Sequence, residues 1–243
     1  MSSLPPGTPF PPPPPPPPPS SGPGGSLPWE MRQSIGFVDA LVETVKLIIT
    51  APQDAFQRMR PKANDYFEPL LFAVIVSWVG VIASQIYGLV FGTATLGMFQ
   101  KYLPADVQRQ LGPMLARNMV GNVVGMVLGP IFIAIFLFIG AGIIHLCLMI
   151  VGGTAQSAAG FEGTFRTMAY ASVADLANLV PFVGGLIAFV WKLVLVVIGL
   201  ATLHRTSSGR AVAAVLIPIA LCCVCLVVFI GAIAALVAGG LRH

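Results

Sequence analysis

The chain has 243 residues, of which 56% are hydrophobic and only 9% are charged, and its formal net charge is +4. A soluble globular domain carries about 25% charged residues, so this chain has too little polar surface to fold in water. Its mean hydropathy of +0.87 supports that exclusion. We therefore expect an all-α, polytopic membrane helix bundle in a lipid bilayer. Its basic residues lie mostly beside apolar runs, where they set orientation in the membrane, so the positive charge does not indicate nucleic-acid binding.

Residues 1–28 are rich in Pro, Gly and Ser, and Pro11 to Pro19 form an unbroken proline run. Such a run favours the extended polyproline II helix, and this composition cannot form a packed core. We predict a disordered tail. It is either a spacer or a ligand for a proline-binding partner, and the lack of flanking basic residues favours the spacer.

Residues 29–68 are predicted to form a cytoplasmic, interfacial helical segment. Within it, residues 34–50 place polar side chains on one helix face and apolar ones on the other. This stretch is too short and too charged to cross a bilayer, so we expect it along the membrane surface or against the other helices. The polar face consists of Asp39, Glu43, Lys46 and Thr50, and a basic cluster of Arg58, Arg60 and Lys62 follows.

The apolar runs between residues 69 and 238 predict a membrane domain with five transmembrane spans. A crossing takes about 20 residues, and residues 168–203 hold enough apolar chain for two short crossings. The chain would turn between them at Pro181, Gly184 and Gly185. A re-entrant hairpin over the same residues is the alternative. The expected spans are residues 69–92, 119–151, 168–183, 185–203 and 211–238.

The distribution of Lys and Arg chooses between the two orientations of such a bundle. More of them fall on the N-terminal side, which predicts a cytoplasmic N-terminus and an exterior C-terminus, in the cell or inner membrane if the source is bacterial. The inner segments would hold Arg32, Lys46, Arg58, Arg60, Lys62, Arg166, Arg205 and Arg210, and the outer ones Lys101, Arg109, Arg117 and Arg242.

Small residues recur at every fourth position in the first two expected spans. Because 3.6 residues make one helical turn, each set forms a stripe that lets another helix approach closely in lipid. The stripes either pack the spans within one chain or form a homodimer face. They consist of Gly80, Ser84, Gly88 and Gly92 in the first span and of Gly121, Gly125 and Gly129 in the second.

Asp175 and Lys192 are charged residues inside apolar sequence, and each lies eight or nine residues from the expected turn. In an antiparallel hairpin they would sit at similar depth, roughly 13 Å from the turn at 1.5 Å per residue. Buried charges in a membrane usually pair, so we predict an ion pair or a shared polar pocket. It is either structural, fixing the register of the hairpin, or part of a proton or ion relay.

Histidines and cysteines give no clear metal site. His145 and Cys147 fall in the second expected span, and Cys222, Cys223 and Cys225 in the last, where helical spacing points Cys223 away from its neighbours. The thiols are expected to be free. Nor do the residues present assemble a catalytic triad or a phosphate-binding loop. We therefore expect no enzyme activity, no metal and no cofactor.

The stretch from Gly152 to Pro218 resembles the Yip1 domain family. An N-terminal element, TAPQDAFQRM leading to DYFEPLLFAVIV, is similar to the bacterial-type members, so the resemblance covers about residues 35–237. Ala174 departs from the pattern, which often has proline there. The residues that carry the resemblance are Gly152 and Gly153, Phe165 and Arg166, Ala169 to Ala171, Pro181 to Gly184, Trp191, Gly199, His204 and Gly209 to Ala211.

The resemblance implies five spans, a cytoplasmic N-terminus and an exterior C-terminus. It implies that eukaryotic members act as adaptors for small prenylated GTPases in vesicle traffic. This chain has Asp65 to Pro69 where those members carry an Asp-Leu-Tyr-Gly-Pro segment, and the bacterial-type members have no settled activity. Two hypotheses follow: a non-enzymatic scaffold or adaptor that binds other membrane proteins or itself, and a small transporter or channel that uses the Asp175 and Lys192 hairpin.

Overall fold

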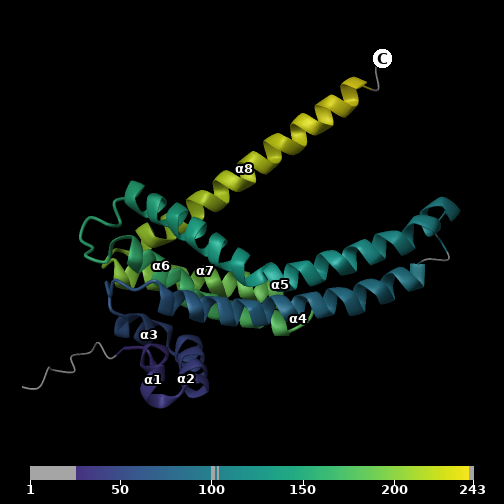
Figure 1. The fold of residues 1–243 in the computed structure, drawn as a ribbon. Helices are drawn as coiled ribbons and strands as arrows, with labels where there is room; N and C mark the ends of the chain where they lie inside the picture. Colours follow the sequence, from purple (N-terminus) through teal and green to yellow (C-terminus); the bar gives the residue numbers. More distant parts are fainter. Residues whose placement is uncertain (1–25, 100–101, 103, 241–243) are drawn as a thin grey trace, which may run out of the picture.

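The structure, a computed structural model, describes residues 26–99, 102 and 104–240, and every element over these residues is a helix (Figure 1). This confirms the all-α class. The expected Pro-rich tail falls almost entirely on residues 1–25, which lie outside the described residues. The described chain begins at residue 26, and its second residue, Leu27, is buried.

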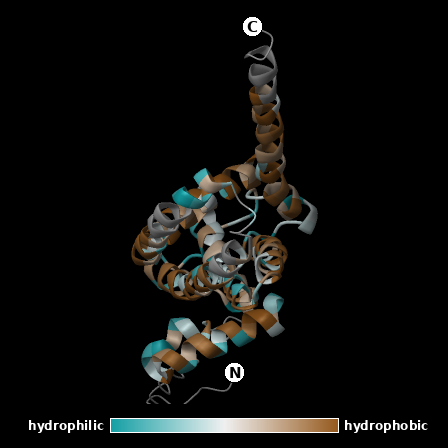
Figure 2. Ribbon diagram, turned by 90° about the vertical axis from the view of Figure 1, so that its right-hand side faces the viewer, coloured by the Kyte–Doolittle hydropathy of each residue, from teal (hydrophilic) through white to brown (hydrophobic). Residues whose placement is uncertain are grey.

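The N-terminal segment consists of four short helices: η1 (Pro28–Met31), α1 (Arg32–Ile35), α2 (Phe37–Thr50) and α3 (Pro52–Arg58). It docks on the bundle through Trp29, whose indole N–H donates to the Glu68 carbonyl at 2.8 Å while its backbone N–H donates to Thr44 Oγ1 at 2.7 Å. Helix α2 lies across the direction of the long helices (Figures 1 and 2).

Four long helices follow: α4 (Phe67–Phe99), α5 (Ala105–Ile150), α7 (Gly184–Leu203) and α8 (Ser208–Gly240). Each holds an apolar stretch long enough to cross a membrane, and hydrophobic residues predominate in the bundle seen end on in Figure 2. The chain is therefore a multi-pass membrane protein. The expected count of five spans is not confirmed, because the stretches are residues 67–92, 119–150, 184–203 and 208–233.

The third expected span, residues 168–183, is not one helix of its own. Helix α6 (Gly160–Ala171) begins before the expected start of this span at residue 168 and is followed end to end by a 3-10 helix, η3 (Ser172–Leu179). The predicted span begins too late in the chain because α6 carries two charged residues, Glu162 and Arg166, which are unusual in a transmembrane helix. Both are buried by the N-terminal segment and the bundle.

Helices α6 and η3 together run antiparallel to α7 and cover the same length of the bundle as the apolar part of α4. At one end, the Glu162 carboxylate accepts the backbone N–H of Ala63 at 2.8 Å, just before α4. At the other, the Tyr87 hydroxyl donates to the Leu179 carbonyl at 2.7 Å. From Phe67 to Tyr87, α4 rises about 30 Å at 1.5 Å per residue.

The stretch between the first two expected spans, residues 93–118, is largely helical. It extends α4 to Phe99 and starts α5 at Ala105, so the two helices form an arm that projects beyond the rest of the bundle (Figure 1). Helix α5 bends along its length, and Pro130 lies in its middle, where a missing N–H weakens the helix.

Helix α8 packs on α5 and α7 only through its first half. Ala211, Ala214 and Val215 are buried there, whereas every residue from 220 to 233 is exposed. Past Pro218 the helix leaves the bundle (Figure 1). A bilayer would cover this apolar half.

Candidate functional site

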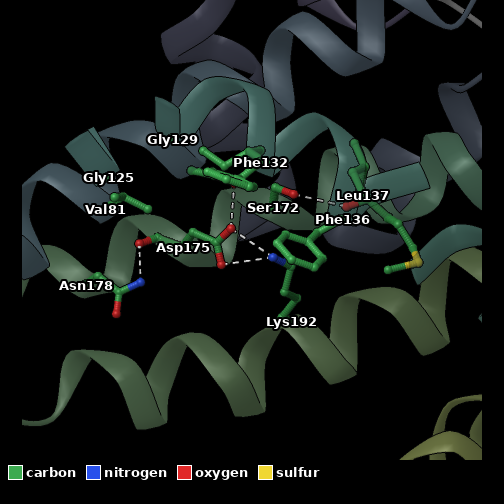
Figure 3. Close-up of a pocket in the computed structure, with 13 residues that line it drawn as sticks. Val81, Gly125, Gly129, Phe132, Phe136, Leu137, Ser172, Asp175, Asn178 and Lys192 are labelled. Atoms are coloured by element: carbon green, nitrogen blue, oxygen red, sulfur yellow. Dashed lines mark hydrogen bonds and ion pairs between the residues drawn. The ribbon is translucent and has the colours of Figure 1, made fainter. Parts of the chain in front are cut away.

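A cavity of about 490 Å³ lies among α4, α5, η3 and α7 (Figure 3). Helices α5 and α7 barely touch each other, so the cavity is a groove between them with α4 and η3 as its floor. Aromatic and small residues of α5 form one wall, and polar groups lie on the floor. The wall includes Gly125, Gly129, Phe132 and Phe136, and the polar groups come from Ser77, Ser172, Asp175, Asn178 and Lys192.

The structure places Asp175 and Lys192 in an ion pair on this floor. Lys192 Nζ donates to both carboxylate oxygens of Asp175, at 2.8 and 3.0 Å, and the Ser77 hydroxyl donates to the same carboxylate at 2.6 Å. The side chains remain 33% exposed for Lys192 and 19% exposed for Asp175. The carboxylate is therefore paired within the protein, while the Lys192 ammonium, with two of its three N–H groups donated to Asp175, is still reachable from the groove.

The pair lies near the middle of the bundle. Ser77 comes ten residues after the start of α4 at Phe67, or about 15 Å along it, half the thickness of a hydrocarbon core of about 30 Å. Lys192 is similarly distant from the two ends of α7. At this depth a charge costs several kcal/mol unless it has a partner (about 3 kcal/mol on insertion scales).

The small residues of the two expected stripes are spread over different surfaces. A Cβ on Gly80 would lie 2.4 Å from the Asp175 carbonyl oxygen, so this glycine lets η3 lie directly on α4. Gly125 and Gly129 face Gln85 and Trp78 of α4 at ordinary contact distance. Ser84 is exposed, and open space surrounds Gly88, Gly92 and Gly121.

The expected break forms the turn between η3 and α7. Phe182 has a φ of 67° and is 83% exposed. A Cβ on Gly184 would lie 2.2 Å from the Ala177 carbonyl oxygen, whereas Gly185 has more room. Pro181 and Gly184 thus end η3 and start α7, which places Asp175 opposite Lys192.

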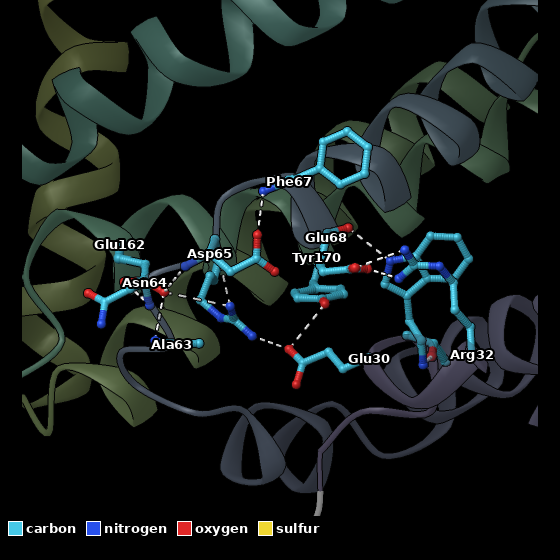
Figure 4. Close-up of polar contacts among 12 residues, drawn as sticks. Glu30, Arg32, Ala63, Asn64, Asp65, Phe67, Glu68, Glu162 and Tyr170 are labelled. Atoms are coloured by element: carbon cyan, nitrogen blue, oxygen red, sulfur yellow. Dashed lines mark hydrogen bonds and ion pairs between the residues drawn. The ribbon is translucent and has the colours of Figure 1, made fainter. Parts of the chain in front are cut away.

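A second polar cluster joins the N-terminal segment to the bundle (Figure 4). Arg166, which is 1% exposed, forms a salt bridge with Glu30 and donates to the Asp65 carbonyl at 3.3 Å. Burial raises the pKa of Glu30, and the Arg166 guanidinium opposes that shift. Nearby, Arg32 Nη2 donates to Glu68 at 2.8 Å.

His145 and His204 come together at the same end of the bundle. The Thr164 hydroxyl lies 2.9 Å from His145 Nδ1 and 2.9 Å from His204 Nε2, and Ser157 lies 2.9 Å from His204 Nδ1. Burial, with a smaller contribution from His145, lowers the pKa of His204 from 6.5 to about 4.

The cysteines lie apart from this histidine cluster or face outward. Cys147 is buried, and Cys222, Cys223 and Cys225 are exposed on α8. Within the part of the chain that the structure describes, no three His, Cys, Asp or Glu side chains meet as a metal site.

Sequence reasoning did not find Ser77, Arg166 or the threonine between the histidines. A serine at mid-span and an acidic and basic residue four positions apart, Glu162 and Arg166, were the available signals. Neither signal identifies the residue that is contacted, because the partners are far apart in sequence. Ser77 and Asp175 are separated by 98 residues, and Arg166 and Glu30 by 136.

Comparison with known proteins gives one match. No curated protein and no solved structure matches the chain. The sequence model of the Yip1 domain family matches residues 46–230, from α2 into the exposed half of α8. Because that match spans most of the sequence, the chain belongs to the Yip1 domain family.

Proposed function

We propose that the protein is a non-enzymatic membrane scaffold or adaptor, which holds a transmembrane helix of another membrane protein in the groove between α5 and α7. The observation that carries this proposal is the Asp175–Lys192 pair on the floor of an open groove of about 490 Å³ at mid-bundle. Lipid tails have no hydrogen-bonding group for such a pair, whereas a transmembrane helix of another protein can place a polar side chain beside it.

The proposal includes five crossings, with α6 and η3 as the third. Together they run from the level of Ala63 to that of Tyr87, as far as the apolar part of α4 does. In this arrangement the N-terminal segment lies in the cytoplasm, the turn at Pro181 to Gly184 faces the exterior, and the C-terminus is also exterior. The greater number of basic residues on the N-terminal side supports this orientation.

The groove walls suit a helix as an occupant. Gly125 and Gly129 already pack against Gln85 and Trp78 of α4 and form the edge of the groove beside that helix. Farther along α5, Phe132 and Phe136 line the same groove and are 48% and 66% exposed, so their rings are available for packing against another helix. Polar contacts between membrane helices contribute about 1 kcal/mol each, which favours a partner with a hydrogen-bonding side chain at mid-span.

The chain's own α8 is a poorer occupant. Its exposed half, residues 220–233, is apolar apart from cysteine thiols, so it cannot satisfy the exposed part of Lys192. An occupant from a different protein, or from a copy with a different helix, is therefore favoured over closure by α8.

Site-directed photocrosslinking in intact membranes tests the proposal. A photoreactive phenylalanine analogue at Phe136 should give a discrete protein adduct, and the same analogue at Val227, which is 70% exposed on α8, should not. The adduct should weaken when Asp175→Ala and Lys192→Ala are combined. Adducts only to lipid from both positions, or the same protein adduct from both, would contradict the proposal.

Transport of a solute is a second candidate, because the same ion pair lies in a cavity at mid-bundle. Purified protein in proteoliposomes should then move ions or small solutes, and Lys192→Ala should abolish the flux. Flux equal to that of empty liposomes would exclude this candidate and leave the scaffold proposal untouched.

A further inference from the structure

A second cavity, of about 400 Å³, lies where α3 meets the end of α7. Three arginines line it: Arg58, the last residue of α3, Arg60, two residues later, and Arg205, which follows the C-cap residue of α7. Among the described residues around this cavity there is no carboxylate. Three cations therefore converge on one hollow, remote from the Asp175–Lys192 groove.

Packing of α3 against α7 builds the floor of this cavity. Phe56 lies on Gly199, where a Cβ would come within 2.8 Å of its ring. Phe56, Met59 and Leu203 are all nearly fully buried and form an apolar base beneath the guanidinium groups. The cavity thus combines an apolar floor with a cationic rim.

Arg205 occupies a position that usually favours glycine. Its φ is +50°, and it closes α7 with a Schellman pair of hydrogen bonds: its N–H donates to the Thr202 carbonyl at 3.4 Å, and the Thr206 N–H donates to the Ala201 carbonyl at 3.1 Å. Glycine adopts this left-handed conformation without strain. Helix termination alone therefore does not account for an arginine here.

The three arginines make no ion pair and donate no side-chain hydrogen bond within the described part of the chain. Glu30 acts electrostatically on Arg60 alone, from outside the cavity lining. The remaining like charges repel each other, and an anion placed among the three guanidinium groups would remove that repulsion. Guanidinium groups match the oxygens of a phosphate particularly well, because their parallel N–H groups can donate to two oxygens at once.

We infer that this cavity binds the phosphate of an anionic phospholipid headgroup. The cavity lies at the end of α7, at the surface level of the proposed cytoplasmic leaflet, where anionic lipids are concentrated. The apolar floor matches the glycerol and upper acyl region better than it matches a soluble phosphate. This inference rests on the proposed orientation but not on the proposed scaffold role, because the cavity is separate from the groove.

Native mass spectrometry of the full-length protein, taken from nanodiscs of phosphatidylcholine with phosphatidylglycerol, tests the inference. The site variant combines Arg58→Gln, Arg60→Gln and Arg205→Gly, and a matched variant combines Lys46→Gln, Lys62→Gln and Arg210→Gln, which removes equal charge from the same end. The site variant should lose about tenfold or more in retained phosphatidylglycerol, since it removes the guanidinium groups that would donate directly to the phosphate. The matched variant should lose less than about twofold, because its residues do not line the cavity and act only through screened, diffuse attraction.

Equal losses in both variants would overturn the inference, because they would indicate diffuse attraction to the membrane. Arg205→Gly alone separates binding from folding: it should lower lipid retention while the melting temperature in lipid-free detergent stays the same or rises. A lower melting temperature there would mean that Arg205 is structural and would contradict its role as a ligand. In a last experiment, soluble glycerol phosphate is added as a competitor. If it displaces phosphatidylglycerol when the two are at equal concentration, the assignment to a membrane lipid is overturned.

Discussion

Arg166 and Glu30, 136 residues apart in the sequence, form a salt bridge that joins the N-terminal segment to the membrane bundle. The arginine is 1% exposed, and the Tyr170 hydroxyl also donates to Glu30, at 3.3 Å. A buried charge without its partner is far less stable than the intact pair. This contact therefore fixes where the N-terminal helices sit relative to the spans.

Arg166→Gln should release the N-terminal segment from the bundle. Removing one partner of a buried pair costs about 3 kcal/mol, so limited proteolysis in mild detergent should cleave the chain between α3 and α4 much faster than in the unaltered protein. Arg210→Gln is the control, because that exposed arginine makes one hydrogen bond, to the Gly152 carbonyl at 3.4 Å. Equal cleavage rates for the two variants would show that Arg166 does not hold the segment.

Asp175 and Lys192 should behave as a coupled pair in a double-mutant cycle. Asp175→Ala alone leaves the Lys192 ammonium unpaired at mid-depth, at a cost of about 2 kcal/mol in unfolding free energy. Adding Lys192→Ala should recover part of this loss. Unfolding in detergent measures all three variants, with Asp39→Ala on the exposed face of α2 as a control. A double variant no more stable than Asp175→Ala would disprove the coupling.

Gly80→Ala should destabilise the bundle although it adds one methyl group. The new Cβ would lie 2.4 Å from the Asp175 carbonyl oxygen, and moving η3 away to make room costs about 1–3 kcal/mol. Gly88→Ala is the matched variant on the same helix, because nothing lies within 4 Å of its Cβ. We expect a lower melting temperature for the first variant and no loss for the second; equal melting temperatures would refute the close approach of η3.

The histidine cluster should make stability depend on pH. The pKa of His204 is about 4 in the folded protein and 6.5 when unfolded, so between these values the unfolded chain binds the proton more readily. Stability is complete above pH 6.5 and falls by up to about 3 kcal/mol as pH drops to 4. Glu30, whose pKa is raised, has the opposite effect, since its contribution is lost as pH rises.

His204→Asn isolates the histidine contribution, because it leaves Glu30 unchanged. The difference in melting temperature between the two proteins should shrink steadily from pH 7 to pH 4. A difference that stays constant over this range would show that His204 does not titrate with a lowered pKa.

The sequence allowed the membrane class, four of the spans and the family to be predicted, because each depends on local composition or on a motif. It also indicated that Asp175 and Lys192 would lie at one depth, since the turn at Pro181 fixes the hairpin register. It missed the early start of α6, because the burial of Glu162 and Arg166 depends on backbone groups and side chains 97 to 136 residues away.

The sequence likewise did not indicate which element packs against each glycine. Gly80 and Gly88 look identical in a fourfold stripe, yet one meets η3 and the other meets open space. The helix that covers a stripe is set by the tertiary path of the chain, which local spacing does not encode.

Placement of the ion pair at mid-membrane requires that residues 160–203 cross the bilayer twice. Labelling of Phe182→Cys with a membrane-impermeant maleimide, in a background with the four native cysteines replaced by serine, tests this directly. The account predicts labelling from the exterior in intact cells, while Ser207→Cys is labelled only after permeabilisation. Labelling of both positions from one side of the membrane would contradict it.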